Sequence, residues 1–172
     1  MTTTRGDIFV VQSRHPFDRL IRVAQHRKFP SLDSSWTHCG IIVDACGGTI
    51  EAVWNGVEYG NVHNYPSAKV FSVFDVGPFN FDTDFVRTHG YLDVQAEIVR
   101  WAERRVGLRY GFATIASIAI AVAIDLPYRF EHQGTYICSG LVASALASAG
   151  IDLGDNPEWT MPAQIAAWGK VV

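Results

Sequence analysis

Cysteine and histidine, which together perform nucleophilic catalysis, occur side by side in the stretch SSWTHCGIIVD, residues 34–44. His38 and Cys39 begin an apolar run that is typical of a β-strand. Neighbouring side chains of a strand point to opposite faces, so these two residues are not expected to meet. Cys39 shares a face with Ile41 and Val43 and is expected to be a small core residue. The partner of His38 must then come from elsewhere in the chain.

Cys138 is the cysteine whose surroundings favour chemistry. It follows a polar loop and opens an apolar helical pattern, so it would occupy the first turn of a helix. Unpaired N–H groups and the positive end of the helix dipole stabilise a thiolate there. The same N–H groups could hold the oxyanion that forms when a thiolate attacks a carbonyl. A buried cysteine that merely begins a helix is the alternative, and Ser139 is expected to cap or pack that helix.

Glu51 is a candidate third member of such a site. If the turn of the hairpin is DACG, residues 44–47, Gly40 pairs with Glu51, and Glu51 shares a face with His38, one diagonal step away. Gly40 would leave the space between them open. A register slipped by two residues places Asn55 opposite His38 instead, and an asparagine also orients an imidazole. A carboxylate would in addition raise the basicity of the imidazole.

The elements that must position these residues follow from periodicity. Strands precede helices along the chain, which favours an α+β fold rather than alternating βαβ units. Strands are predicted at 7–12, 36–43, 48–54 and 68–76. Helices are predicted after Ser13 as N-cap, from 91 to a stop at Gly107, and from 138 to a stop at Gly150.

Composition limits the classes of function. The 172 residues, of which 48% are hydrophobic and 18% charged, correspond to one globular domain, 1–172. A net charge of −3 without a basic cluster argues against nucleic acid as a partner. The sequence has only three cysteines, an odd number, which argues against a scaffold held together by disulfides. The N-terminus lacks the pattern of a signal peptide, so a cytoplasmic location is expected, with release by another route left open.

The sequence lacks the motifs of serine hydrolases, phosphate-binding loops and zinc sites. The sequence has no GxSxG elbow and no glycine-rich phosphate loop, and no cofactor is expected. A zinc site built from His38, Cys39, Cys46 and His63 matches no standard ligand spacing, so no metal is expected either.

An uncharged stretch, 110–124, is the most apolar part of the sequence. It is shorter than the about 20 residues that a transmembrane helix needs. No transmembrane span is therefore predicted; a buried helix, a pocket wall or a homo-oligomer contact is expected, and contact with lipid stays open. Trp36 and Trp54 flank the predicted histidine and glutamate strands and are candidates to line a substrate cleft.

Several short motifs together resemble a known superfamily. CSGLV at the start of a helix, with GLRYG at 107–111 before it, resembles the nucleophile region of NlpC-type papain-like cysteine peptidases. Those families place the cysteine helix before the histidine strand, whereas here GDIF, WTHCGIIV and TIEA precede YICSGLV. This order is similar to the circularly permuted branch, the YiiX-like and lecithin-retinol-acyltransferase-like proteins. The resemblance extends from Gly6 to the MPAQIAAW segment.

The resemblance implies a permuted papain-like fold, a small antiparallel sheet packed against helices, with the nucleophile at a helix N-terminus. It implies Cys138 as nucleophile, His38 as general base and Glu51 as the group that orients the imidazole. Tyr110 would shape the pocket or support the oxyanion. The implied activity is hydrolysis of a peptide or peptidoglycan-type amide through a thioester acyl-enzyme. An acyltransferase or lipid esterase or thioesterase, which the inserted segment 112–124 favours, and a catalytically silent binding module are the alternatives.

Overall fold

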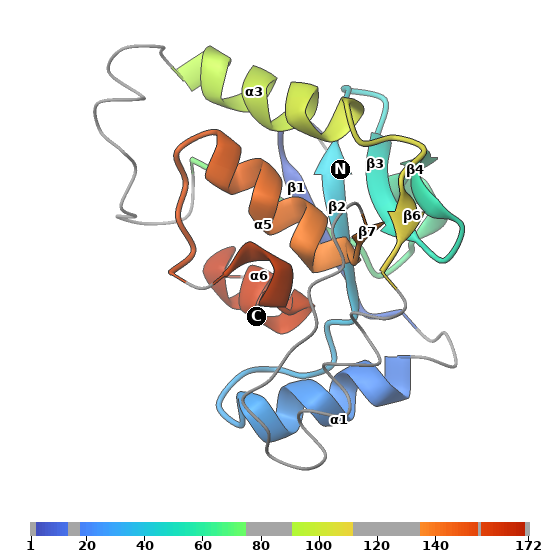
Figure 1. Ribbon diagram of the computed structural model, residues 1–172, viewed down its shortest axis with the longest axis vertical. Helices are drawn as coiled ribbons and strands as arrows, with labels where there is room; N and C mark the ends of the chain where they lie inside the picture. The colour runs from blue at the N-terminus through green and yellow to red at the C-terminus, as the bar shows by residue number, and fades with distance from the viewer. Residues whose placement is uncertain (1–2, 14–17, 75–90, 112–134, 155, 171–172) are drawn as a thin grey trace.

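The computed structural model describes residues 3–13, 18–74, 91–111, 135–154 and 156–170, and it has an α+β fold (Figure 1). Five strands form one sheet: β1 (Ile8–Val11), β2 (His38–Ile42), β3 (Gly48–Val53), β4 (Gly56–Asn61) and β5 (Lys69–Phe71). The four described α-helices are α1 (Asp18–Lys28), α3 (Tyr91–Glu103), α5 (Cys138–Ser148) and α6 (Pro162–Trp168). Two short strands, β6 (Arg109–Tyr110) and β7 (Thr135–Tyr136), pair in parallel beside them.

The sheet has the order β4-β3-β2-β1-β5, and every neighbouring pair is antiparallel. In Figure 1, α5 crosses β1 and β2, with α3 on one side of α5 and α6 on the other. Every residue of β1 is buried, because alternate side chains enter two different apolar clusters. Ile8 and Val10 pack with the helices, whereas Phe9 and Val11 pack on the opposite face with Ile42.

The first three predicted strands are confirmed to within two residues at each end. The strand predicted at 68–76 is shorter than expected: β5 ends at Phe71, a turn follows at 73–74, and 75–90 lie outside the described residues. β4 was not predicted, although it pairs with β3 along its whole length. Its signal was the Asn55–Gly56 dipeptide, typical of a hairpin turn, where Gly56 has a φ of +134°.

The predicted helices around α3 and α5 are confirmed, and the two glycines expected to end them, Gly107 and Gly150, both have positive φ. α1 begins at Asp18; the predicted start after Ser13 and the apolar stretch 112–124 lie outside the described residues. None of the helices in the described ranges is long and apolar enough to cross a membrane.

The buried side of α1 includes a polar side chain. Leu20 is 43% exposed, whereas the polar Gln25 is fully buried. Gln25 Nε2 donates to the carbonyls of Ser34 and Trp36, at 3.2 and 2.9 Å, and its Oε1 accepts from the Ala163 N–H at 2.8 Å. A buried amide needs such partners. Gln25 therefore ties α1 and α6 to the loop that leads into β2.

Candidate active site

Cys138 is the first residue of α5, as predicted. Ile137 before it has an extended backbone (φ −92°, ψ 161°), and its carbonyl accepts a hydrogen bond from the Leu141 N–H at 2.9 Å. The first N–H groups of an α-helix have no intrahelical acceptor, and the helix dipole is positive at this end. The Cys138 side chain is 4% exposed. A negative charge on its sulfur is therefore favoured by the local backbone.

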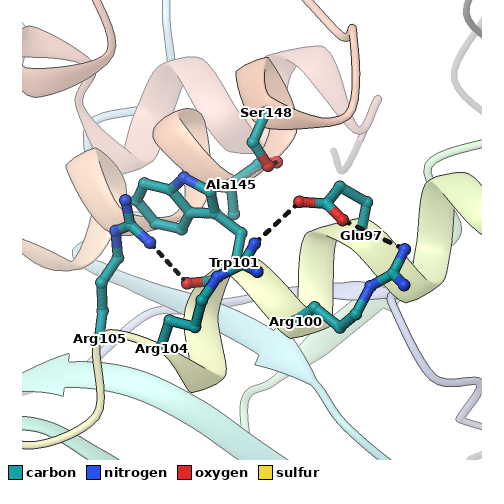
Figure 2. Close-up of polar contacts among 7 residues, drawn as sticks. All are labelled: Glu97, Arg100, Trp101, Arg104, Arg105, Ala145 and Ser148. Atoms are coloured by element: carbon teal, nitrogen blue, oxygen red, sulfur yellow. Dashed lines mark hydrogen bonds and ion pairs between the residues drawn. The ribbon is translucent and has the colours of Figure 1, made fainter.

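The start of α5 is fixed by β7, which directly precedes it. Tyr136 of β7 pairs with Tyr110 of β6, and its hydroxyl accepts a hydrogen bond from Arg105 Nε at 3.1 Å. The Arg105 guanidinium lies 3.3 Å from the centroid of the Trp101 ring and donates to the Trp101 carbonyl at 2.9 Å (Figure 2). Trp101 packs edge-on against Tyr136, with ring centroids 5.7 Å apart. Arg105 thus anchors the segment before Cys138 to α3.

His38 and Glu51 are brought together by the predicted hairpin register. β2 and β3 pair through Ile41↔Ile50 and Ile42↔Thr49, the register that places Glu51 on the face of His38. His38 Nε2 and Glu51 Oε2 are 2.5 Å apart. The side chains reach each other across the diagonal step, and they form a charge-assisted contact when the imidazole is protonated.

Glu51 is held by three partners. Its residue is 3% exposed, a burial that costs free energy unless the carboxylate is satisfied. The Tyr65 hydroxyl donates to Oε2 at 2.6 Å, and the Thr49 hydroxyl donates to Oε1 at 2.9 Å. Burial by itself raises the pKa of the Glu51 carboxyl, but His38, Tyr65 and Thr49 together lower it below its ordinary value. Glu51 is therefore a fixed anion beside the imidazole.

The space beside Gly40 is occupied by an aromatic ring and is not open as expected. A Cβ at Gly40 would lie 2.5 Å from Cε1 of Phe9, so the phenyl ring fills the space that the sequence analysis predicts to be open. The Phe9 ring packs edge-on against His38, with centroids 5.9 Å apart, and stacks on Tyr65 at 5.8 Å. Glycine is required here because an aromatic ring supports the imidazole from that side.

His38 joins Glu51 to Cys138. Because Nε2 contacts Glu51, Nδ1 is the ring nitrogen left for the hydrogen bond with the Cys138 sulfur. Burial lowers the pKa of the His38 imidazole, but the hydrogen bonds and charges of Cys138 and Glu51 outweigh it and raise the pKa to about 10. The imidazole is therefore protonated at neutral pH and faces an anion on either side.

The pKa of the Cys138 thiol is held well below its ordinary value. The largest cause is a hydrogen bond from the Cys39 side chain, followed after the opposing effect of burial by the hydrogen bond and charge of His38 and by the Cys39 backbone N–H. Cys138 and His38 therefore rest as a thiolate–imidazolium pair. Such a thiolate attacks an electrophilic carbon or sulfur without first losing a proton.

Cys39 is buried in the core, as predicted, but it also contacts the candidate nucleophile. The sequence argument that His38 and Cys39 cannot face each other does not prevent both from reaching a third residue. Cys138 lies at the start of α5, which packs against both β2 and β3. It shares an apolar cluster with Cys39 on the face of β2 that α5 covers, and it also forms a hydrogen bond with His38, the first residue of the strand.

Two weaker candidates lie close to the site. Tyr110 pairs with Tyr136, two residues before Cys138, and burial, then the negative charge of Cys138, raise the pKa of its phenol, so it stays neutral. The Ser139 hydroxyl is fully buried and donates to the Thr160 carbonyl at 2.5 Å. Ser139 thus packs the start of α5 against the segment before α6, and its hydroxyl is committed to that contact.

Three other candidates, Trp36, Trp54 and Asn55, stay predictions as substrate-binding residues. Trp36 is 3% exposed and belongs to the apolar core. Trp54 is 67% exposed in the turn between β3 and β4. Asn55 is exposed in the same turn, because the observed register is not the slipped one that would place it opposite His38. Glu51, not Asn55, is the residue that meets the imidazole.

Sequence reasoning missed Thr49, Tyr65 and Cys39 as parts of this cluster. Thr49 precedes Glu51 by two residues on one strand, so the shared face could have been read from the alternation. Tyr65 follows a short 3₁₀ turn, Val62–Asn64, and no sequence pattern directs its hydroxyl to Glu51. The role of Cys39 depends on the packing of α5, which strand periodicity does not address.

Among the described residues, no group of three or more His, Cys, Asp or Glu side chains is arranged to hold a metal ion. No model of a known protein family matches the chain. No curated protein is significantly similar to it in sequence.

Proposed function

We propose that this protein is a cysteine hydrolase that cleaves an amide bond of a peptide or peptidoglycan-type substrate. The observation that carries the proposal is the chain of contacts from Glu51 through His38 to Cys138 at the N-terminus of α5. A thiolate, an imidazolium and a buried carboxylate in this order are the parts of a thiol-dependent acyl-transfer site. The chain order, histidine strand, glutamate strand, then cysteine helix, supports a permuted papain-like arrangement.

In the proposed first half-reaction, the Cys138 thiolate attacks the carbonyl carbon of the substrate. Backbone N–H groups at the start of α5 stabilise the oxyanion, since they point along the positive end of the helix dipole. The His38 imidazolium gives its proton from Nδ1 to the leaving amine. A thioester on Cys138 and a neutral imidazole remain, and the Glu51 carboxylate keeps the ring in place.

In the second half-reaction, neutral His38 takes a proton from water as the water attacks the thioester carbon. The tetrahedral intermediate collapses, the acid product leaves, and the thiolate–imidazolium pair is restored. The same thioester could pass its acyl group to another nucleophile, which is the acyltransferase alternative. An ester or thioester substrate would enter through the same first step.

The decisive experiment is turnover of matched acyl-amide, acyl-ester and acyl-thioester substrates, with mass spectrometry of the intact protein after acid quench. We expect amide cleavage and an acyl adduct on Cys138. Cys138→Ser and His38→Ala should each lower kcat/KM by at least about 1,000-fold, and Glu51→Gln by about 100-fold. Cys46→Ser and His26→Ala, at exposed positions, are the matched controls.

The outcomes separate the candidate functions. Turnover of esters or thioesters alone, or transfer of the acyl group to an added amine, would replace amide hydrolysis by the lipid-esterase or acyltransferase alternative. An activity that survives both Cys138→Ser and His38→Ala would overturn the assignment of the site. If iodoacetamide labels Cys138 no faster than Cys46, Cys138 is not an activated nucleophile, and the catalytically silent binding module becomes the preferred function.

A further inference from the structure

Cys39 and Cys138 are two free thiols that lie in the same apolar cluster. Cys39 is fully buried and Cys138 nearly so. Cys39 is the second residue of β2, Cys138 is the first residue of α5, and α5 packs against β2 (Figure 1). The side chain and the backbone N–H of Cys39 lower the pKa of the Cys138 thiol, which is consistent with the two cysteines being neighbours. The third cysteine, Cys46, is exposed in the turn after β2.

We propose that Cys39 and Cys138 are a peroxide-responsive dithiol: a peroxide oxidises Cys138, and Cys39 then closes a disulfide that reversibly removes the nucleophile. As a regulatory device this inference rests on the proposed function, since it switches the same site. The disulfide chemistry itself requires only the two thiols and a peroxide. It therefore has readouts that do not involve any substrate.

The oxidation begins at Cys138. Its thiolate sulfur attacks one oxygen of hydrogen peroxide, an S–O bond forms and the O–O bond breaks. The hydroxide that leaves takes the proton of the His38 imidazolium and becomes water. Cys138 is now a sulfenic acid, two electrons more oxidised than the thiolate, and His38 is neutral.

Cys39 completes the reaction. Its sulfur attacks the Cys138 sulfur, an S–S bond forms, and the hydroxyl group leaves with the Cys39 proton as a second water. In balance, two thiols and one hydrogen peroxide give one disulfide and two waters. The disulfide also protects Cys138 from further oxidation to sulfinic acid, which thiols do not reverse.

The two cysteines have the unequal properties that this sequence of steps needs. Burial, and then the adjacent Cys138, raise the pKa of the Cys39 thiol well above its ordinary value. Cys39 therefore stays a thiol and a hydrogen-bond donor while Cys138 is the thiolate that peroxide attacks. Because Cys39 is buried against Cys138, its nearest electrophile is the sulfenic acid rather than peroxide in solution.

The test exposes the whole protein to hydrogen peroxide and maps its peptides without reduction. We expect a Cys39–Cys138 cross-link, loss of two hydrogen atoms from the intact mass, and loss of iodoacetamide labelling at Cys138. Dithiothreitol should restore the labelling fully. A disulfide that involves Cys46, or Cys138 driven to sulfinic acid while Cys39 remains a free thiol, would overturn the inference.

Variants at the two other cysteines sharpen the result. In Cys39→Ser and Cys39→Ala, peroxide should add two or more oxygen atoms to Cys138, and dithiothreitol should not recover its labelling. Cys46→Ser is the matched control and should behave as wild type. Circular dichroism before oxidation confirms that each variant is folded. Full recovery of labelling in a folded Cys39 variant would show that Cys39 does not resolve the sulfenic acid.

The two proposals fail in different ways. If the protein turns over a substrate but forms no Cys39–Cys138 disulfide, only the dithiol proposal is wrong. If the protein forms the disulfide reversibly but has no activity that depends on Cys138, the hydrolase proposal is wrong and the redox-active thiol pair remains.

Discussion

The Tyr65 hydroxyl donates a 2.6 Å hydrogen bond to the same oxygen of Glu51, Oε2, that His38 Nε2 contacts. The carboxylate is thereby fixed from two directions at one atom, while Thr49 holds the other oxygen. Tyr65 touches the imidazole ring as well, with centroids 5.5 Å apart. Tyr65 is therefore a positioning residue for the His38–Glu51 pair.

Tyr65→Phe should reduce activity by loosening that pair while it keeps the aromatic packing on Phe9. We expect a fall of about tenfold in kcat and a loss of about 1–2 kcal/mol in the free energy of unfolding, because a hydrogen bond to a buried charge is removed. The measurement is steady-state kinetics with urea unfolding. Tyr59→Phe, at an exposed tyrosine of β4, is the control and should change neither quantity. Unchanged kinetics in Tyr65→Phe would deny Tyr65 a positioning role.

Gly60→Ala should disturb Glu51 without altering any polar group of the site. Gly60 pairs with Thr49 across β3 and β4, and a Cβ there would collide with Oε1 of Glu51. The carboxylate must then move away from its hydrogen bond with the Thr49 hydroxyl. We expect slower alkylation of Cys138 and lower activity than in Tyr59→Ala, which changes the preceding residue of the same strand. Alkylation at the wild-type rate would show that the cluster tolerates the shift.

The pH dependence of Cys138 alkylation follows from the two shifted groups. The depressed pKa of Cys138 predicts that labelling is already near its plateau at neutral pH, below the ordinary thiol value of about 8.5. The proton on His38, whose pKa is raised to about 10, should be lost only at alkaline pH, so kcat/KM should fall there. In His38→Ala the labelling profile should shift toward the ordinary thiol value. If the pH profile of alkylation is the same in His38→Ala as in wild type, His38 does not lower the pKa of the Cys138 thiol.

The same raised pKa has a consequence for stability. An imidazole whose folded-state pKa lies above its unfolded value of about 6.5 stabilises the fold fully below that pH. The contribution diminishes as pH rises through about 10, where folded His38 loses its proton. The pH dependence of urea unfolding, compared between wild type and His38→Ala, measures it. The lowered pKa of Cys138 contributes stability that grows as pH rises toward the ordinary thiol value of about 8.5, so the two contributions offset each other up to that pH. The difference in free energy of unfolding should therefore shrink only between about pH 8.5 and the His38 pKa of about 10; a difference that stays constant over that upper range would contradict the charged pair.

Two adjacent arginines give a matched pair of variants. Arg105 lies over Trp101 and donates to Tyr136, whereas Arg104 forms an exposed ion pair with Glu97 at 3.1 Å (Figure 2). Arg105→Ala should lower the free energy of unfolding by about 1–2 kcal/mol and slow the labelling of Cys138, because β7 loses its anchor. Arg104→Ala should cost less than about 1 kcal/mol and leave labelling unchanged. Equal effects of the two variants would show that the anchor does not position Cys138.

The sequence by itself determined most of the local structure and the pairing that makes the candidate site. Strict alternation placed His38 and Cys39 on opposite faces of β2, and the length of the DACG turn set the register that brings Glu51 to His38. The change from polar loop to apolar helical spacing located Cys138 at the first turn of α5. These features depend on residues close together in the chain, so period and turn length suffice to predict them.

Only the tertiary structure decided what surrounds that site. Phe9 fills the space at Gly40, Tyr65 caps the Glu51 carboxylate, and Cys39 meets Cys138, although none of these partners is near the other in sequence. Such contacts depend on how α5 and the two apolar clusters pack against a twisted sheet, and periodicity carries no information on that packing. The alternation rule correctly separated His38 from Cys39; the helix that packs across the strand is what lets a single sulfur reach both.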